Sequence, residues 1–142
     1  MSKPPAHGFS VRPAVADDLP ALLELDQRVR MGPDQPAHAA DWLDDDPANF
    51  VREWVSHGQC HVAVDGGTLV GYGVLHHHFF HSGIIDMIIV DAAYRRRGIG
   101  TTLVRYLAER CTSPKVWIST NLSNQPMQAL IAREGFQFAV FI

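Results

Sequence analysis

Apolar residues in the second half of the chain change their spacing at a short polar turn. Residues 84–90 are apolar except for Asp86, and most are β-branched, which is typical of a buried strand. After the turn, apolar residues recur at helical spacing at Ile99, Leu103 and Leu107. The pattern predicts a strand, a loop and then a helix over residues 98–111.

The first half of the chain carries two further helical patterns. Residues 9–12 alternate like a short strand, and Asp17 or Asp18 is placed to cap the helix that follows. The expected buried stripe of this helix is Leu19, Leu22, Leu23 and Val29. Glycine and prolines at 32–36 end it, and Pro47 is placed to start a second helix that stops at Gly58. Its apolar face is Phe50, Val51, Trp54 and Val55.

Turn residues divide the rest of the chain into strands and a last helix. Asp-Gly-Gly at 65–67 favours a hairpin between strands at 60–64 and 68–73, and a second turn near 81–83 leads into residues 84–90. A strand at 116–119 follows the helix at 98–111, so these two strands are expected to run parallel. The last helix is capped by Ser123 or Asn124 and ends at Gly135. The succession predicts an α/β fold.

The composition is that of one globular domain. The chain has 142 residues, 46% hydrophobic and 19% charged, which predicts a single domain over 1–142 with a flexible N-terminus at 1–8. The opening lacks the apolar core of a signal peptide, and no apolar run reaches membrane-spanning length, so we expect a cytoplasmic protein that does not bind a membrane. Cys60 and Cys111 stand far apart, which indicates reduced packing residues.

Charge is divided unevenly along the chain. Residues 1–60 hold ten acidic and five basic side chains, whereas residues 61–142 hold five acidic and seven basic ones. A basic second half fits an anionic cofactor. An acidic first half would attract a cationic acceptor, repel nucleic acid, or simply form a solvated face, so no nucleic-acid partner is expected.

The polar turn before the predicted helix at 98–111 has the features of an anion site. The first N–H groups of a helix lack intrahelical partners and carry partial positive charge. Gly98 and Gly100 let a bulky anion approach the main chain, and Arg95, Arg96 and Arg97 add charge around it. A diphosphate would suit this turn. The third glycine of a Rossmann motif and the Gly-Lys-Ser/Thr ending of a P-loop are both missing, which excludes those two sites.

The same turn resembles the acyl-CoA motif of the GNAT acetyltransferases, Arg/Gln-x-x-Gly-x-Gly/Ala, through Arg95, Gly98 and Gly100. The similarity continues through the strand that ends at Val90 and through residues 121–136. It implies a single GNAT-like α/β domain, with a mixed central sheet, helices on both faces and parallel strands that splay at the cofactor cleft. It also implies acetyl-CoA as acyl donor, and transfer of acetyl to a primary amine by direct attack in a ternary complex.

The resemblance assigns the cofactor to three segments of the chain. Main-chain groups of the strand would hold the thioester and pantetheine arm, the turn would hold the diphosphate, and an amide near the last cap would meet the pantetheine arm. The implied cofactor-binding residues are Ile88, Ile89, Val90, Arg95, Arg96, Arg97, Gly98, Ile99, Gly100, Thr101, Asn121 and Asn124. For Asn124, a role as a simple helix cap is the alternative.

Acidic residues are the candidates for handling the acceptor amine. In the GNAT fold the first helical region lines the acceptor side, so several carboxylates there would hold an ammonium group, or else only cap helices and aid solubility: Asp41, Asp44, Asp45, Asp46 and Glu53. Asp86 is a candidate base, where burial within the strand would strengthen it, or a strand-edge acid paired with an arginine. His76 is the alternative base, because its strand flanks the cleft.

The expected general acid is missing. Many GNAT enzymes place a tyrosine four residues before the glycine of a Gly-Phe pair, and counting back from Gly135 gives Ile131. Because a thiol has a pKa of roughly 8.5, the thiolate would leave unprotonated or through water. Otherwise a hydroxyl substitutes, from Ser119, Thr120 or Ser123. The alternatives to an enzyme are a non-catalytic acyl-CoA-binding module and a protein-interaction domain with a vestigial loop.

Two further patterns concern metals and partners. His76, His77, His78 and His81 lie close together, and strand alternation places His76 and His78 on one face, but zinc needs at least three convergent donors, so no metal is expected. The chain ends at 142, and an apolar edge at 138–142 favours a homodimer. The expected acceptor is a small-molecule or peptide amine.

Overall fold

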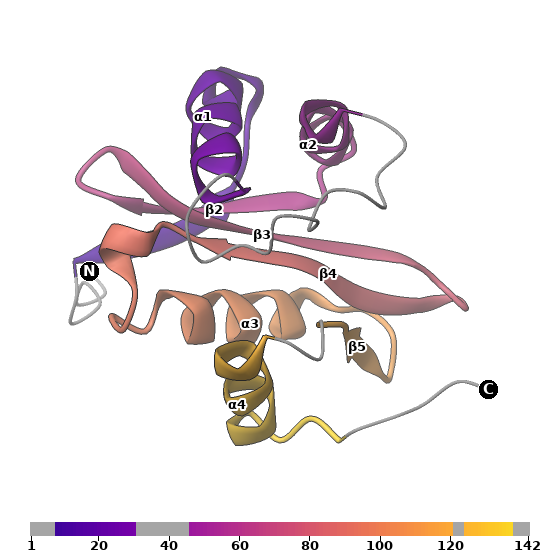
Figure 1. The fold of residues 1–142 in the computed structure, drawn as a ribbon. Coiled ribbons are helices and arrows are strands. Elements are labelled where there is room, and N and C mark those ends of the chain that lie inside the picture. The colour runs from indigo at the N-terminus through magenta and orange to yellow at the C-terminus, as the bar shows by residue number, and fades with distance from the viewer. Residues whose placement is uncertain (1–7, 31–45, 121–123, 138–142) are drawn as a thin grey trace, which may run out of the picture.

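The computed structural model describes residues 8–30, 46–120 and 124–137, which form one mixed sheet with helices on both of its faces (Figure 1). The described sheet has five strands in the order β1-β2-β3-β4-β5. Their bounds are β1 Phe9–Pro13, β2 Cys60–Asp65, β3 Thr68–Phe79, β4 Ser82–Val90 and β5 Val116–Ile118. The helices are α1 Leu19–Arg30, α2 Pro47–Ser56, α3 Ile99–Arg110 and α4 Gln125–Arg133, with short 3-10 turns η1 Ala16–Asp18 and η2 Ala92–Tyr94.

The two faces of the sheet carry different helices. Helices α1 and α2 cover one face, and α3 and α4 lie on the other (Figure 1). Val62, Tyr72 and Val74 pack against α1 and α2. On the opposite face, Leu75 and Ile85 pack against α3. The predicted fold class is confirmed, as is the parallel pairing of β4 with β5 across α3.

Most of the predicted elements are present, with differences in the length of one strand and in the buried face of one helix. The strand predicted at 68–73 continues to Phe79, and the turn after it is made by Phe80 and His81, which both have positive φ. The expected stripe of α1 is buried at Leu22 and Val29, with Leu25 in addition, whereas Leu23 is half-buried. Among the helices of the described ranges, none has both the length and the apolar character needed to cross a bilayer.

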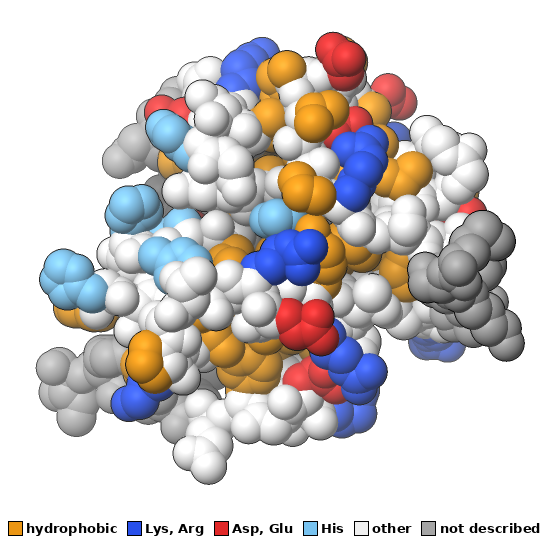
Figure 2. Space-filling view, turned by 180° about the vertical axis from the view of Figure 1, so that it is seen from behind, with side chains coloured by type: hydrophobic (Ala, Val, Ile, Leu, Met, Phe, Trp, Pro, Cys, Tyr) orange, Lys and Arg blue, Asp and Glu red, His pale blue; other side chains and the backbone are white. Residues whose placement is uncertain are grey.

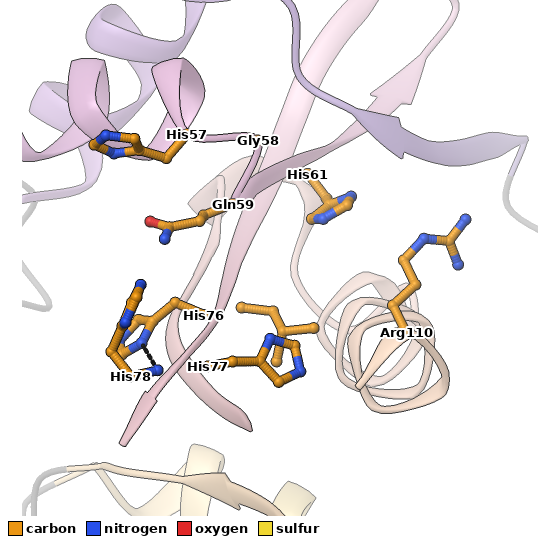
Figure 3. Close-up of a pocket in the computed structure, with 9 residues that line it drawn as sticks. His57, Gly58, Gln59, His61, His76, His77, His78 and Arg110 are labelled. Atoms are coloured by element: carbon orange, nitrogen blue, oxygen red, sulfur yellow. Dashed lines mark hydrogen bonds between the residues drawn. The ribbon is translucent and has the colours of Figure 1, made fainter. Parts of the chain in front are cut away.

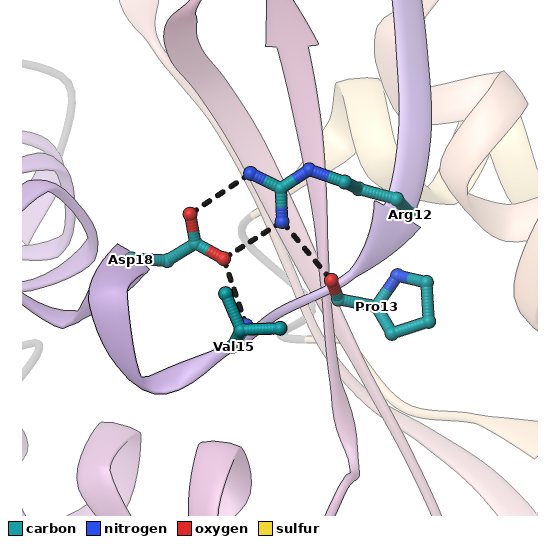
Figure 4. Close-up of polar contacts among 4 residues, drawn as sticks. All are labelled: Arg12, Pro13, Val15 and Asp18. Atoms are coloured by element: carbon teal, nitrogen blue, oxygen red, sulfur yellow. Dashed lines mark hydrogen bonds and ion pairs between the residues drawn. The ribbon is translucent and has the colours of Figure 1, made fainter.

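The predicted capping by Asp17 or Asp18 is confirmed only in part, because Val15 is the N-cap of the turn before α1 and Asp18 contributes the capping-box bond to it. Asp18 closes the η1 turn that precedes α1, and its carboxylate accepts the main-chain N–H of Val15 at 2.8 Å and both terminal nitrogens of Arg12, at 2.8 and 2.9 Å (Figure 4). Arg12 comes from β1 and also donates to the carbonyl of Pro13. This ion pair therefore joins β1 to the start of α1. The hydrogen bond from Arg12 is the main reason why the pKa of Asp18 lies below its ordinary value.

We expect Arg12→Ala to destabilise the protein at neutral pH but not in acid. A carboxyl group whose pKa is lowered by folding stabilises the folded state above its ordinary pKa, and that stability is lost as the pH falls through the lowered value. Because the Arg12 side chain is 44% exposed, solvent screening limits the expected loss at pH 7 to about 1 kcal/mol. Urea unfolding at pH 7 and again below pH 3 measures this difference. Arg52→Ala, on the exposed face of α2, is the control. A loss that is equal at both pH values would contradict the role of the pair.

Candidate active site

The parallel pairing of β4 with β5 ends near the middle of β4. Their pairing runs from Gly83 with Val116 to Ile85 with Ile118, and β4 then continues for five residues to Val90. On its other side this part of β4 is paired with β3, with Met87 opposite Val74 and Val90 opposite Gly71. Within the described chain, residues 86–90 therefore have a strand neighbour on one side only. The parallel pairing ends with Ile118, the last residue of β5, so the predicted splay between the two strands stays a prediction.

The start of α3 lies at the end of that one-sided strand. Gly98, with φ 80° and ψ 10°, is the N-cap in a left-handed conformation that favours glycine. The first i to i−4 bond of the helix runs from the N–H of Thr102 to the carbonyl of Gly98, at 3.0 Å. The N–H groups of Ile99, Gly100 and Thr101 precede it, so they have no acceptor within the helix. The start of α3 is thus open to an anion.

Gly100 allows α3 to approach both β4 and α4. A Cβ at this position would lie 3.2 Å from Leu130 of α4 and 3.8 Å from Val90 at the end of β4. The open helix start and the one-sided strand are therefore adjacent. The side chain of Ile99 is 2% exposed and packs in the core, as do Ile88 and Val90 in part. These predicted residues could therefore contact a cofactor only through their main chain. The same holds for Ile89, whose side chain packs on the α1 face.

The three arginines of the turn differ in their surroundings. Arg95 and Arg96 are exposed, and Arg96 has a φ of 65°. Arg97 is half-buried, and its guanidinium lies 3.6 Å from Asp65 at the end of β2 and 5.1 Å from the ring centroid of Tyr94. The three side chains still supply a concentration of positive charge beside the open amides.

Asp91 fixes the turn and was missed by the sequence analysis. Its main-chain N–H donates to the carbonyl of Val70, and its carboxylate accepts the N–H of Ala93 at 3.1 Å and a nitrogen of Arg28 at 2.7 Å. Burial alone would raise the pKa of Asp91, but the bonds from Ala93 and Arg28 hold that pKa below its ordinary value. An acid directly before a short helical turn was the available signal. Asp91 joins the end of β4 to α1.

Asp86 and His76, the two candidate bases, lie next to each other. Nε2 of His76 is 3.3 Å from Oδ2 of Asp86. The Asp86 side chain is 41% exposed, so its expected burial is only partial, and its ion-pair partner is a histidine rather than the arginine that the sequence analysis considered. The rings of His76 and His78 stack with centroids 5.6 Å apart, which confirms that they share a face.

A polar groove opens beside this histidine pair, between the end of α2, β3 and the end of α3 (Figure 3). Its volume is about 380 Å³, and it is lined by His57, Gly58, Gln59, His61, Leu75, His76, His77, His78 and Arg110. Histidine side chains gather toward one side of the molecule in the space-filling view (Figure 2). In the part of the chain that is described, no group of three or more histidine, cysteine or acidic residues is placed to bind a metal ion.

The remaining predicted residues divide between described and undescribed parts of the chain. Asn124 caps α4, and its side-chain oxygen accepts the N–H of Met127 at 3.2 Å. Asp46 caps α2 in the same way, through the N–H of Ala48 at 3.0 Å, and Glu53 is exposed on α2. Ile131 is half-buried on α4. The predictions for Asp41, Asp44, Asp45, Asn121 and Ser123 lie outside the described residues.

Comparison with known proteins gives one family and several relatives. The family described as "Acetyltransferase (GNAT) family" matches residues 19–136. N-alpha-acetyltransferase 30 of Xenopus laevis is 33% identical over 94 residues, which cover 61% of this chain and 34% of the relative. N-alpha-acetyltransferase RimI of Mycobacterium tuberculosis is 36% identical over 97 residues, which cover 64% of this chain and 60% of the relative. The chain thus matches between about a third and three fifths of these two proteins.

A solved structure shows the same fold. The crystal structure of a GNAT-family acetyltransferase from Bacillus cereus superposes with a TM-score of 0.75 over 94% of this chain and 86% of that one. The two sequences are 24% identical, so this similarity concerns the fold alone.

Proposed function

Because the chain belongs to the acetyltransferase (GNAT) family, we propose that it transfers the acetyl group of acetyl-CoA to a primary amine, by direct attack in a ternary complex. The observation that carries this proposal is the position of the open start of α3 at the end of the one-sided half of β4. The open start of α3 suits the diphosphate of a nucleotide, and the one-sided half of β4 suits an extended amide chain. Coenzyme A contains both groups in sequence.

The donor would bind through main-chain groups. We place the diphosphate at the amides of Gly98, Ile99, Gly100 and Thr101, with Arg95, Arg96 and Arg97 around it. The pantetheine arm would add to β4 along Ile88, Ile89 and Val90, because this edge of the strand has no neighbour in the described chain and the main-chain groups of alternate residues, Ile88 and Val90, face it. The side-chain oxygen of Asn124 accepts the capping bond, so its NH₂ group would be the donor to that arm. Asn121 is proposed to contact the arm beside it.

The transfer needs few side chains. Attack of the amine on the thioester carbon forms the N–C bond, the C–S bond breaks, and the electron pair leaves on sulfur. A thiolate whose conjugate acid has a pKa of roughly 8.5 is a good leaving group near neutral pH. The isoleucine at position 131 is therefore compatible with catalysis. The amine must still lose a proton, for which Asp86 and His76 are the candidates.

We propose the α-amine of a peptide as the acceptor. The two relatives described above are named N-alpha-acetyltransferases. An α-amine has a pKa of about 7.8, so roughly a tenth of it is neutral at pH 7, compared with less than about a thousandth of a lysine side chain. A site that has only a weak base is thus better matched to an α-amine. Asp46 and Glu53 of α2, with Asp41, Asp44 and Asp45 of the undescribed segment, would supply negative charge on the acceptor side.

A matched pair of peptides tests this proposal. We expect thiol release from acetyl-CoA with a peptide that has a free N-terminus and an acetylated lysine. We expect roughly a hundredfold lower kcat/KM with the same peptide acetylated at its N-terminus and free at its lysine, in line with the two neutral fractions. Binding of acetyl-CoA without release by any amine would instead favour the non-catalytic module. Failure to bind acetyl-CoA at all would favour the protein-interaction domain.

We further propose that the enzyme forms a homodimer. The support is the apolar C-terminal sequence at 138–142, which follows the last described residues. Light scattering at high protein concentration should give twice the mass of the chain, and a monomer there would exclude the dimer.

A further inference from the structure

Asp86 occupies a β-bulge at the point where the pairing of β4 with β5 ends. On β3, Val74 pairs with Met87 and Leu75 pairs with Ile85, so Asp86 is an extra residue of β4 without a cross-strand partner. A bulge of this kind redirects a side chain relative to strict alternation. Ile85 is also the last residue of β4 that pairs with β5. Asp86 is therefore the first residue of β4 beyond its parallel pairing with β5.

The ring of His76 is held at both of its nitrogens. Nδ1 accepts the main-chain N–H of His78 at 3.1 Å, and Nε2 lies 3.3 Å from Oδ2 of Asp86 (Figure 3 shows the first of these bonds). A neutral imidazole has one donor nitrogen and one acceptor nitrogen. Because Nδ1 accepts a hydrogen bond, the proton of the neutral ring lies on Nε2, the nitrogen that is 3.3 Å from Oδ2 of Asp86.

This arrangement separates the roles of the two candidate bases. His76 could take a further proton only at Nδ1, and it would then lose its bond from the N–H of His78. The Asp86 carboxylate directs one oxygen toward His76, and its other lone pairs have no partner among the residues that the structure describes. Two other ionisable rings lie near this pair: that of His78, stacked on His76, and that of His57, across the groove from α2.

Resting on the proposed acetyl transfer, we propose that Asp86 is the catalytic base that accepts the proton of the acceptor amine, and that His76 is a positioning residue that holds this carboxylate. As the N–C bond forms, the proton on nitrogen passes to a carboxylate oxygen of Asp86, directly or through one water. The C–S bond then breaks with its electron pair on sulfur. The protonated Asp86 afterwards returns its proton to solvent, so that the products are the amide and free coenzyme A.

Three variants test the assignment kinetically. Asp86→Asn removes the base and is expected to lower kcat by about a hundredfold or more, which is the usual contribution of a general base. His76→Ala removes only the polar contact to Asp86 and is expected to lower kcat by about tenfold. His76→Gln is expected to restore most of that loss, because the amide nitrogen of glutamine places an N–H near the position of Nε2 but cannot act as a base. Calorimetry should give the same acetyl-CoA affinity for all three.

The control for these variants is His81→Ala, which removes an exposed histidine at the β3–β4 turn, outside the lining of this groove, and is expected to leave kcat unchanged. If His76→Gln is as inactive as His76→Ala while Asp86→Asn keeps more than half of kcat, the histidine is the base and the assignment is overturned.

The histidine tautomer provides a readout that does not depend on activity. In ¹⁵N-labelled protein, long-range proton–nitrogen spectra distinguish the two nitrogens of the His76 ring, whose signals are identified by their loss in His76→Gln. We expect the proton on Nε2, and a proton on Nδ1 would overturn the proposal. If the wild-type chain releases no thiol with any amine, the proposed function itself fails. The position of the proton on the His76 ring would still test the proposed arrangement of His76 and Asp86.

Discussion

Gly98→Glu is expected to abolish the binding of acetyl-CoA while the fold is largely kept. The new carboxylate would stand at the N-cap of α3, where the diphosphate is proposed to bind, and would repel it. Gly98 is exposed, and the left-handed conformation costs about 1–2 kcal/mol for a residue other than glycine. We expect the affinity to fall by at least about a hundredfold, which corresponds to about 2.8 kcal/mol.

Calorimetric titration of acetyl-CoA into the variant measures this loss. Gly135→Glu is the matched control, because Gly135 also has positive φ, with nothing within 4 Å of an added Cβ, but lies after the end of α4. The control introduces the same charge and the same type of strain, and should bind acetyl-CoA like the wild type. An affinity for Gly98→Glu within threefold of the wild type would show that the anion binds elsewhere.

Asp26→Ala is expected to cause the largest loss of stability. Asp26 is 3% exposed, and its two oxygens accept the Tyr72 hydroxyl at 2.5 Å and Nε of Arg30 at 2.8 Å. Tyr72 itself is fully buried, and that burial, followed by the charge of Asp26, raises the pKa of its hydroxyl. Removing Asp26 would leave a buried hydroxyl and a largely buried guanidinium without their partner, which typically costs about 3–5 kcal/mol.

Urea unfolding monitored by circular dichroism measures this cost, with Asp17→Ala on the exposed surface as the control. The combined variant Asp26→Leu, Arg30→Met and Tyr72→Phe should recover most of the stability, because replacing a buried polar group together with its partners leaves none unpaired. A loss below about 1 kcal/mol for Asp26→Ala would mean that α1 is held on the sheet by apolar packing alone.

The parts of the fold that were predicted correctly depend on short-range signals. The β-branched run before the turn predicts β4, and the glycines at 98 and 100 mark the start of α3. The parallel pairing of β4 with β5 follows from a crossover helix between them. The first two signals each lie within a few neighbouring residues, and the third follows from the order of the elements along the chain, so a sequence pattern is sufficient to detect them.

The parts that were missed depend on partners far apart in the sequence. In the sequence, Asp26 cannot be distinguished from the other polar residues of an amphipathic helix, because the hydroxyl that donates to it belongs to Tyr72, 46 residues later. Asp18 has the sequence context of a helix cap, but its ion pair with Arg12 of β1 is not visible in that context. The contact between His76 and Asp86 depends on an extra residue in β4, and a bulge leaves no mark on composition or periodicity.

The most direct measurement is the crystal structure of the protein with acetyl-CoA at saturating concentration. We expect diphosphate oxygens within hydrogen-bonding distance of the amides between Gly98 and Thr101, with the pantetheine arm paired along β4 beyond Ile85. A cofactor bound at another part of the surface, or a turn whose amides are bonded to the protein itself, would contradict the proposed acetyl-CoA site.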